Sequence, residues 1–101
     1  RNSKVFDIYN CLKEYGVECF VFDDNADSQE IEKEYKVKAL SFDELHDFDC
    51  VIFAVAHNSF KNLNIKSLFR NDKKSKKVII DIKSMFDKKS LEEQGYSVWR
   101  L

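Results

Sequence analysis

Apolar residues recur at helical spacing in the first part of the chain. Over residues 3–15 they fall on one face of a helix, at Val5, Ile8, Leu12 and Tyr15. Ser3 is a suitable N-cap residue, and Gly16 follows where a left-handed residue ends a helix at little cost. We therefore predict a helix over residues 3–15 that stops at Gly16.

Short runs of β-branched and aromatic residues predict strands. Residues 50–56 (CVIFAVA) are the most hydrophobic stretch of the chain, and such a run is typical of a strand covered on both faces, as in a parallel sheet. The other predicted strands are residues 17–22, a short piece at 37–40, residues 78–81 and an edge strand at 96–101.

Between the strands the pattern returns to helices with recognisable start signals. Asp27 is followed by Glu30, and Ser41 by Glu44, a spacing that lets two side chains satisfy free backbone N–H groups at a helix start. The expected helices cover residues 27–35, 41–46, 58–70 and 85–94.

The alternation of strands and helices predicts parallel pairing. We expect an α/β fold, a three-layer Rossmann-like domain with a parallel sheet. No repeat or linker interrupts the chain, so residues 1–101 are expected to form one domain. The chain opens on a helix and lacks an initiator Met, so we expect a fragment of a longer protein that lacks the first strand of its sheet.

Composition and charge narrow the class of protein. Apolar residues make up 44% and charged residues 35% of the 101 residues, the balance of a globular domain. The net charge of −1 argues against a nucleic-acid partner, which a basic excess would favour. The longest apolar run, residues 51–56, is far shorter than the ~20 residues that span a bilayer. We expect no membrane partner and a cytoplasmic location.

Three cysteines are too widely spaced to suggest a metal or redox motif. Cys11, Cys19 and Cys50 include no CxxC pair, and only His46 and His57 could supplement them as ligands. We interpret the cysteines as buried or half-buried free thiols in a reducing compartment.

The two glycines exclude the glycine-rich phosphate loops. Gly16 and Gly95 lie too far apart for a dinucleotide fingerprint or a P-loop, so a contact with phosphate must come from Lys, Arg or a helix N-terminus. In open α/β sheets, ligands bind beyond the carboxyl ends of the strands. The candidate residues at these ends are Asp23, Asp24, His57, Asp81 and Lys83.

Each candidate has a structural and a functional interpretation. His57 can act as a general base, bind a phosphate or sugar, or cap loop backbone. Lys83 can reach an anion or lie in solvent, and Asp81 can hold Lys83 or cap the next helix. Asp23 and Asp24 are more typical of a turn than of acid–base groups. Near the chain end, Trp99 and Arg100 are interpreted as an edge-strand anchor and a surface charge.

Several segments, taken in order, carry a family resemblance. They are residues 1–4 (RNSK), 12–16 (LKEYG), the strand ending in Asp23, residues 54–57 (AVAH) followed by Phe60, residues 80–83 (IDIK), and residues 95–96 (GY) running into 99–101 (WRL). Together they resemble the C-terminal domain of the UDP-glucose/GDP-mannose dehydrogenase family over nearly the whole chain. The AVAH and WRL segments resemble the branch that oxidises UDP-N-acetylhexosamines of the galactosamine or mannosamine type.

The resemblance implies an enzyme of two α/β domains. It implies an N-terminal domain that binds NAD, a C-terminal domain that covers the UDP-sugar, and a homo-oligomer, commonly a dimer. The implied reaction is two NAD-dependent oxidations of the sugar C6 alcohol to a carboxylate, through a cysteine thioester, for capsule or O-antigen polysaccharide. None of the three cysteines resembles the family's Gly-flanked nucleophile. We therefore expect this chain alone to be inactive, with no catalytic residue.

Two residues match the family's functional positions. The resemblance assigns Arg1 to the family Arg that reaches the cofactor across the domain interface, and Lys83 to the cation that faces the substrate. A charge-assisted contact from Lys83 to the diphosphate of a UDP-sugar makes physical sense. His57 lies in a branch-specific motif and is expected to line the site.

The chain departs from the family at its start. The family's first strand, with a Phe-Lys motif that contacts substrate, is absent upstream of Arg1. We therefore expect residues 17–22 to pair directly with residues 50–56, or another chain to fill the empty place in the sheet.

Two other interpretations remain open. Asp23, Asp24 and Lys83 imitate a receiver-like or flavodoxin-like binding module, although no phosphoacceptor Asp stands on a strand between the acidic pair and the lysine. The nine Phe allow an oligomerisation domain with an apolar face, and the simpler interpretation is that they fill the core.

Overall fold

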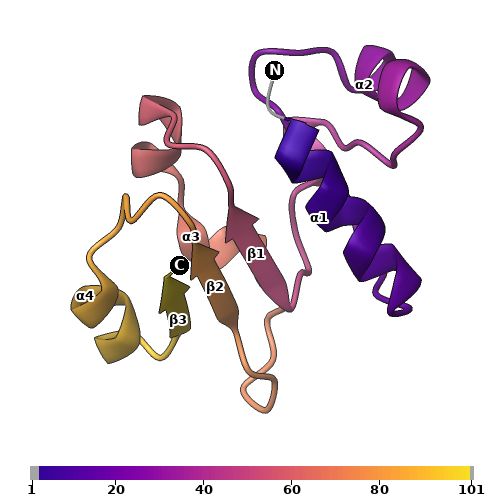
Figure 1. Ribbon diagram of the computed structural model, residues 1–101. Helices are drawn as coiled ribbons and strands as arrows, with labels where there is room; N and C mark the ends of the chain where they lie inside the picture. The colour runs from indigo at the N-terminus through magenta and orange to yellow at the C-terminus, as the bar shows by residue number, and fades with distance from the viewer. Residues whose placement is uncertain (1–2, 101) are drawn as a thin grey trace. The chain divides into compact units, whose positions relative to one another are not determined.

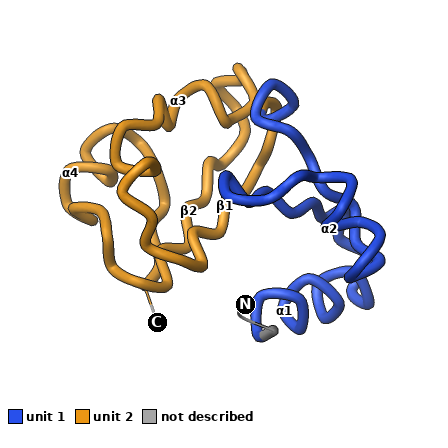
Figure 2. The backbone as a smooth tube through the Cα atoms, turned by 90° about the horizontal axis from the view of Figure 1, so that it is seen from above, with its two compact units in different colours: residues 1–45 blue, residues 46–101 orange. Residues whose placement is uncertain are grey.

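The computed structural model describes residues 3–100, and the chain divides into two compact units. The first is Arg1–Leu45 and the second is His46–Leu101 (Figure 2). The expectation that residues 1–101 form one UDP-binding domain stays a prediction.

The first unit is built from two helices around a small apolar core. The helices are α1 (Ser3–Glu14) and α2 (Ser28–Tyr35), and the buried residues of the core are Tyr9 on α1, Ile31 on α2, and Val37 and Ala39 after α2. The ring of Phe6 stacks on that of Tyr35 at 4.0 Å between centroids. The Tyr9 hydroxyl accepts a hydrogen bond of 2.9 Å from the Lys38 amide, so the buried phenol also fixes the backbone after α2.

The predicted helix boundaries hold closely in this unit. α1 ends at Glu14, and Gly16 adopts the left-handed conformation that the sequence predicts, with φ of 81°. Asp27 caps α2 by accepting a hydrogen bond of 3.0 Å from the Gln29 amide. The Ser41 amide donates to the Glu44 carboxylate at 2.9 Å, and this capping pair opens only a 3-10 turn, η1 (Phe42–Glu44).

The strands predicted at residues 17–22 and 37–40 are reduced to one parallel bridge. Val21 pairs with Ala39 through bonds of 2.8 Å from the Val21 amide to the Lys38 carbonyl and from the Leu40 amide to the Val21 carbonyl. The Ser41 turn follows Leu40 at once and ends the pairing on that side of the bridge. The expected pairing of residues 17–22 with residues 50–56, or of either segment with a strand from another chain, stays a hypothesis.

The second unit contains a parallel sheet of three strands. The strands are β1 (Cys50–Phe53), β2 (Val78–Asp81) and β3 (Ser97–Arg100), in the order β1-β2-β3 (Figure 1). The register places Phe53 beside Asp81 and Asp81 beside Arg100. The predicted α/β class with parallel pairing is confirmed.

The strand that is covered on both sides is β2, not the strand predicted from the most hydrophobic run. Residues 50–56 were expected to form a strand buried on both faces, but β1 ends at Phe53 and lies at one side of the sheet, with only Phe53 buried. β2 lies in the centre, where Ile79 and Asp81 are both 0% exposed. The apolar run is therefore longer than the strand that it forms.

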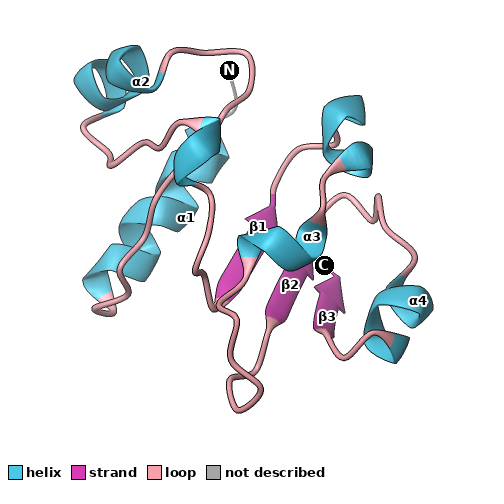
Figure 3. Ribbon diagram, turned by 180° about the vertical axis from the view of Figure 1, so that it is seen from behind, coloured by secondary structure: helices cyan, strands magenta, loops and turns pink. Residues whose placement is uncertain are grey.

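The helices of the second unit are shorter than predicted (Figure 3). Residues 58–70 split into the 3-10 helix η2 (Asn58–Asn62) and α3 (Ile65–Leu68). Leu63 and Asn64 between them are extended, and asparagine side chains favour non-helical backbone. α4 (Lys88–Glu93) begins later than residue 85, at the cap formed by Asp87, which has extended backbone and accepts from the Ser90 amide. Within residues 3–100, no helix has the length and apolar character to cross a membrane.

We predict that Ile79→Ala destabilises the second unit by about 2–5 kcal/mol, since it removes a fully buried side chain from the central strand. Urea unfolding followed by the fluorescence of Trp99, the single tryptophan, reports on this unit because Trp99 lies on β3. Ile79→Val should cost roughly 0.5–1.5 kcal/mol. Equal midpoints for all three proteins would contradict this account of the core.

Candidate functional site

Two sequence-predicted residues lie at the carboxyl edge of the sheet, where the parallel strands end. His57 follows β1 and Lys83 follows β2, and the ends of these strands, Phe53 and Asp81, are register partners. The structure therefore brings His57 and Lys83 to the same edge. Ligands of parallel α/β sheets bind at this edge, so it is the candidate binding site.

Aromatic packing supports the two loops that carry these residues. The Phe53 ring contacts Phe60, in η2 after β1, at 6.0 Å, and Phe86, in the loop after β2, at 4.8 Å between centroids. The half-buried His57 has its ring 5.3 Å from that of Phe60. One buried side chain at the end of β1 thus supports both loops.

The loop after β2 is held by the buried carboxylate of Asp81. Its Oδ1 accepts a hydrogen bond of 3.0 Å from the Met85 amide, and its Oδ2 accepts one of 2.9 Å from the Phe86 amide. The sequence left two roles open for Asp81, holding Lys83 or capping the next helix. The cap of α4 is Asp87, which accepts from the Ser90 amide, so the helix-cap interpretation of Asp81 is wrong.

Lys83 lies in the tight turn that leaves β2. The Ser84 amide donates to the Asp81 carbonyl at 3.3 Å, and Ser84 has a positive φ of 53°. The Ile82 amide donates to the Phe53 carbonyl at 3.2 Å, which extends the β1–β2 ladder by one bond. Lys83 itself is exposed, so a cation stands in solvent on backbone that is fixed on both sides.

Arg100 is the member of this edge that sequence reasoning missed. It was interpreted as a surface charge, but its Nη2 donates a hydrogen bond of 2.7 Å to the Phe86 carbonyl. The only signal in the sequence is a cation at the end of a predicted edge strand. Its partner, 14 residues away, follows from the parallel register of β3 on β2.

Asp23 and Asp24 line a pocket in the first unit. The pocket of about 440 Å³ lies after Val21 and Ala39 and beside the start of α2, and Asp27 lines it as well. Asp23 accepts from the Asn25 amide at 2.9 Å, as the predicted turn interpretation requires. Three carboxylates repel a diphosphate, so this pocket is a poor site for a nucleotide phosphate.

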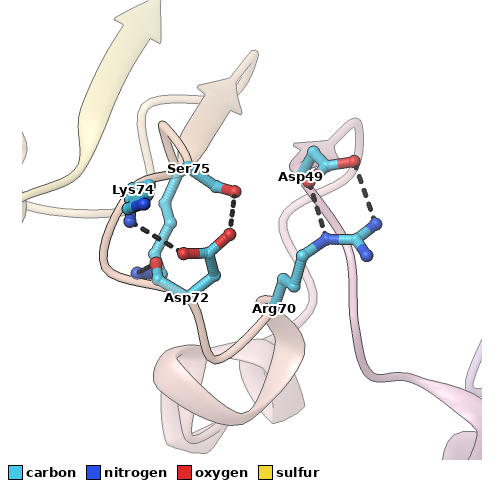
Figure 4. A network of polar contacts seen from close by, with 6 residues as sticks. Asp49, Arg70, Asp72, Lys74 and Ser75 are labelled. Carbon is cyan, nitrogen blue, oxygen red and sulfur yellow. Dashed lines mark hydrogen bonds and ion pairs between the residues drawn. The ribbon is translucent and has the colours of Figure 1, made fainter.

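A hollow of about 1000 Å³ lies at the opposite, amino edge of the sheet in the second unit. Four cations line it: Lys66, Arg70, Lys73 and Lys77. Two of them serve structural contacts, since Arg70 binds both carboxylate oxygens of Asp49 at 3.1 and 3.3 Å, and Lys77 donates to the Asp72 carbonyl at 3.1 Å. Figure 4 shows this network, in which Asp72 also organises its own loop.

The cysteines are more exposed than predicted. Cys11 and Cys50 are exposed free thiols, and Cys19 is half-buried, so the burial interpretation is wrong for two of the three. Cys50 is exposed because it begins the outer strand β1. Residues 3–100 hold no group of three or more His, Cys, Asp or Glu that could bind a metal ion.

The described residues do not fit the nicotinamide cofactor that the resemblance implies. Gly16 and Gly95, with φ of 81° and 99°, each follow the end of a helix, whereas a dinucleotide loop needs glycines that open one. The residue assigned to the cofactor, Arg1, lies outside the described residues.

The fold and this edge define an α/β protein with a parallel sheet and an exposed lysine on fixed backbone at the carboxyl ends of its strands. A model of the UDP-glucose/GDP-mannose dehydrogenase family, UDP binding domain, matches residues 1–88, and the chain belongs to this family. The match spans the whole of the first unit and most of the second.

Curated relatives agree with the family. The chain is 33% identical over 87 residues to a UDP-N-acetyl-D-glucosamine 6-dehydrogenase of Pseudomonas aeruginosa, covering 86% of this chain and 20% of the relative. It is 30% identical over 83 residues to the enzyme of the same name in Salmonella typhi, covering 82% and 19%. It is 34% identical over 101 residues to Protein CapL of Staphylococcus aureus, covering 100% and 23%. The chain thus spans about a fifth of the length of these relatives, and no solved structure matches it significantly.

We predict a pKa for Asp72 below the usual 3.8, because the Lys74 amide and the Ser75 hydroxyl donate to its carboxylate. A pKa lowered by folding stabilises the folded chain above the unfolded pKa, and this contribution is lost as the pH falls through the folded value. NMR titration of the Asp72 carboxyl carbon measures the midpoint. Ser75→Ala should raise it and Ser90→Ala should not, and a wild-type midpoint at or above 3.8 would refute the assignment.

We also predict that iodoacetamide at pH 8 modifies Cys19 several-fold more slowly than Cys11 and Cys50. Burial raises the pKa of the Cys19 thiol, only partly opposed by a hydrogen bond from the Phe20 backbone, and only the thiolate reacts. Mass spectrometry after short exposure gives the three rates, and chain unfolded in urea provides the control in which they converge. Equal rates in the folded chain would contradict the burial of Cys19.

Proposed function

We propose that this chain is the substrate-covering part of an NAD-dependent UDP-sugar 6-dehydrogenase, and that Lys83 binds the diphosphate of the UDP-sugar. The observation that carries the proposal is the exposed lysine on fixed backbone at the carboxyl edge of the sheet. A lysine amine makes charge-assisted hydrogen bonds to phosphate oxygens. The family, described as a UDP binding domain, supplies the ligand class.

The proposed substrate is a UDP-N-acetylhexosamine, with a UDP-hexose as the broader class. Two relatives are named for UDP-N-acetyl-D-glucosamine, and the oxidation of a C6 alcohol to the carboxylate would give a uronic acid for surface polysaccharide. NAD would be the oxidant, held mainly by another part of the protein, with Arg1 as a contact from this chain. We assign no catalytic residue here, and His57 is proposed to line the sugar side of the edge.

The proposal also covers the location of the protein and its partners. Three free cysteines suit a reducing compartment, so we propose a cytoplasmic protein. We further propose a homo-oligomer, at least a dimer, with neither nucleic acid nor membrane as partner.

Lys83→Met in the full-length protein should weaken UDP binding about 10- to 100-fold, the range for loss of a charged hydrogen bond. Uridine, which lacks the phosphates, should bind the variant and the unchanged protein equally. Isothermal titration with both ligands measures the two affinities.

Two further variants complete this test. Lys83→Arg keeps the charge and should retain most of the affinity for UDP. Lys89→Met removes an exposed lysine of α4 with the same change in net charge and should bind UDP normally. If Lys83→Met binds UDP as tightly as the unchanged protein, Lys83 is not the diphosphate contact, and if the unchanged protein binds no UDP, the proposed function itself is wrong.

A further inference from the structure

The loop that carries Lys83 is fastened to all three strands of the sheet. From β1, the Phe53 carbonyl accepts from the Ile82 amide at 3.2 Å. From β2, the Asp81 carboxylate accepts from the amides of residues 85 and 86. From β3, Arg100 donates to the Phe86 carbonyl at 2.7 Å. Lys83 stands between the first of these attachments and the other two.

The attachments by Asp81 and Arg100 differ in whether the fold needs them. Asp81 is 0% exposed, and a buried carboxylate is costly unless hydrogen bonds satisfy it, so its two amide partners are a condition of the fold. Arg100 is exposed, and solvent could satisfy its guanidinium without Phe86. The hydrogen bond from Arg100 to the Phe86 carbonyl is therefore not needed to satisfy a buried group. Its effect is to hold the loop after β2 in one conformation.

A lysine amine on a long, flexible side chain gains from fixed backbone beneath it. Binding costs the rotational freedom of each side chain that it immobilises, and a mobile loop adds the cost of ordering the backbone. Binding groups are held best when their supports are themselves locked by hydrogen bonds and packing. Here Phe86 supplies the packing through its contact with Phe53 at 4.8 Å.

We propose that Asp81 and Arg100 are positioning residues that hold the turn from which Lys83 reaches the diphosphate. The inference rests on the proposed function of Lys83. Neither residue contacts the ligand under this proposal: the carboxylate fixes the amides of residues 85 and 86, the guanidinium fixes the carbonyl of Phe86, and both act through the position of Lys83.

The test is a double-mutant cycle in the full-length protein, with UDP and uridine as the titrated ligands. Arg100→Met should weaken UDP binding roughly 3- to 10-fold, the range of one ordinary hydrogen bond, and leave uridine binding unchanged. Added to Lys83→Met, it should cause no further loss, because a residue that acts only through Lys83 has nothing left to position. Arg100→Lys, which can still donate to the Phe86 carbonyl, should recover part of the affinity.

Two more variants complete the experiment. Arg70→Met removes the arginine that pairs with Asp49 before β1 and should leave UDP binding unchanged. Asp81→Asn keeps the shape but only one acceptor oxygen, and should behave as Arg100→Met does. If it does not fold, the Arg100 cycle decides alone.

The outcomes separate this inference from the function on which it rests. Additive losses in Arg100→Met and Lys83→Met would mean that Arg100 contacts the ligand or acts elsewhere, and would overturn the positioning role. A normal UDP affinity for Arg100→Met, with Lys83→Met impaired, would overturn it as well and leave the proposed function intact. Normal affinity for Lys83→Met would instead refute the proposed role of Lys83.

Discussion

The second unit depends on one buried carboxylate. Asp81 ends the central strand with no exposed surface, and an unsatisfied polar group in that position would cost on the order of 1–3 kcal/mol or more. The amides of Met85 and Phe86 satisfy it, and α4 begins after them, at the cap formed by Asp87. The same two bonds hold the chain that follows β2, so one side chain fastens the turn that carries the exposed Lys83 to the end of the central strand.

Charge is distributed unevenly along the chain. The excess of basic residues in the second unit favours an anionic ligand there. Residues 1–45 hold 6 Lys and Arg against 11 Asp and Glu, whereas residues 46–101 hold 11 against 7. The acidic pocket beside α2 follows this division. Within the second unit, the amino edge is also rich in lysine, but Arg70 and Lys77 there bind backbone or carboxylate groups of their own loops. The carboxyl edge combines a positive unit with the ligand position of parallel sheets.

The sequence predicted the kinds of elements better than their lengths. Gly16, Gly95 and Asp27 act locally, and their predicted roles as two helix stops and a cap are found in the structure. The predicted helix over residues 58–70 and the strand over residues 50–56 were too long, because periodicity does not reveal where the backbone finds other partners. Asn64 leaves the helix, and β1 ends where its ladder with β2 ends.

The sequence by itself determined that strands and helices alternate and that His57 and Lys83 follow strands. It also excluded a glycine-rich phosphate loop and carried the family resemblance. Each of these features depends on neighbouring residues or on the order of segments along the chain, so the spacing of residue types in the sequence is enough to predict it. Only the tertiary structure decided that β2 is the central strand, that Asp81 holds a loop rather than a helix, and that Arg100 reaches the Phe86 carbonyl. Each of these requires groups that lie on different elements to meet, and the strand order that brings them together is not encoded in the periodicity of any one segment.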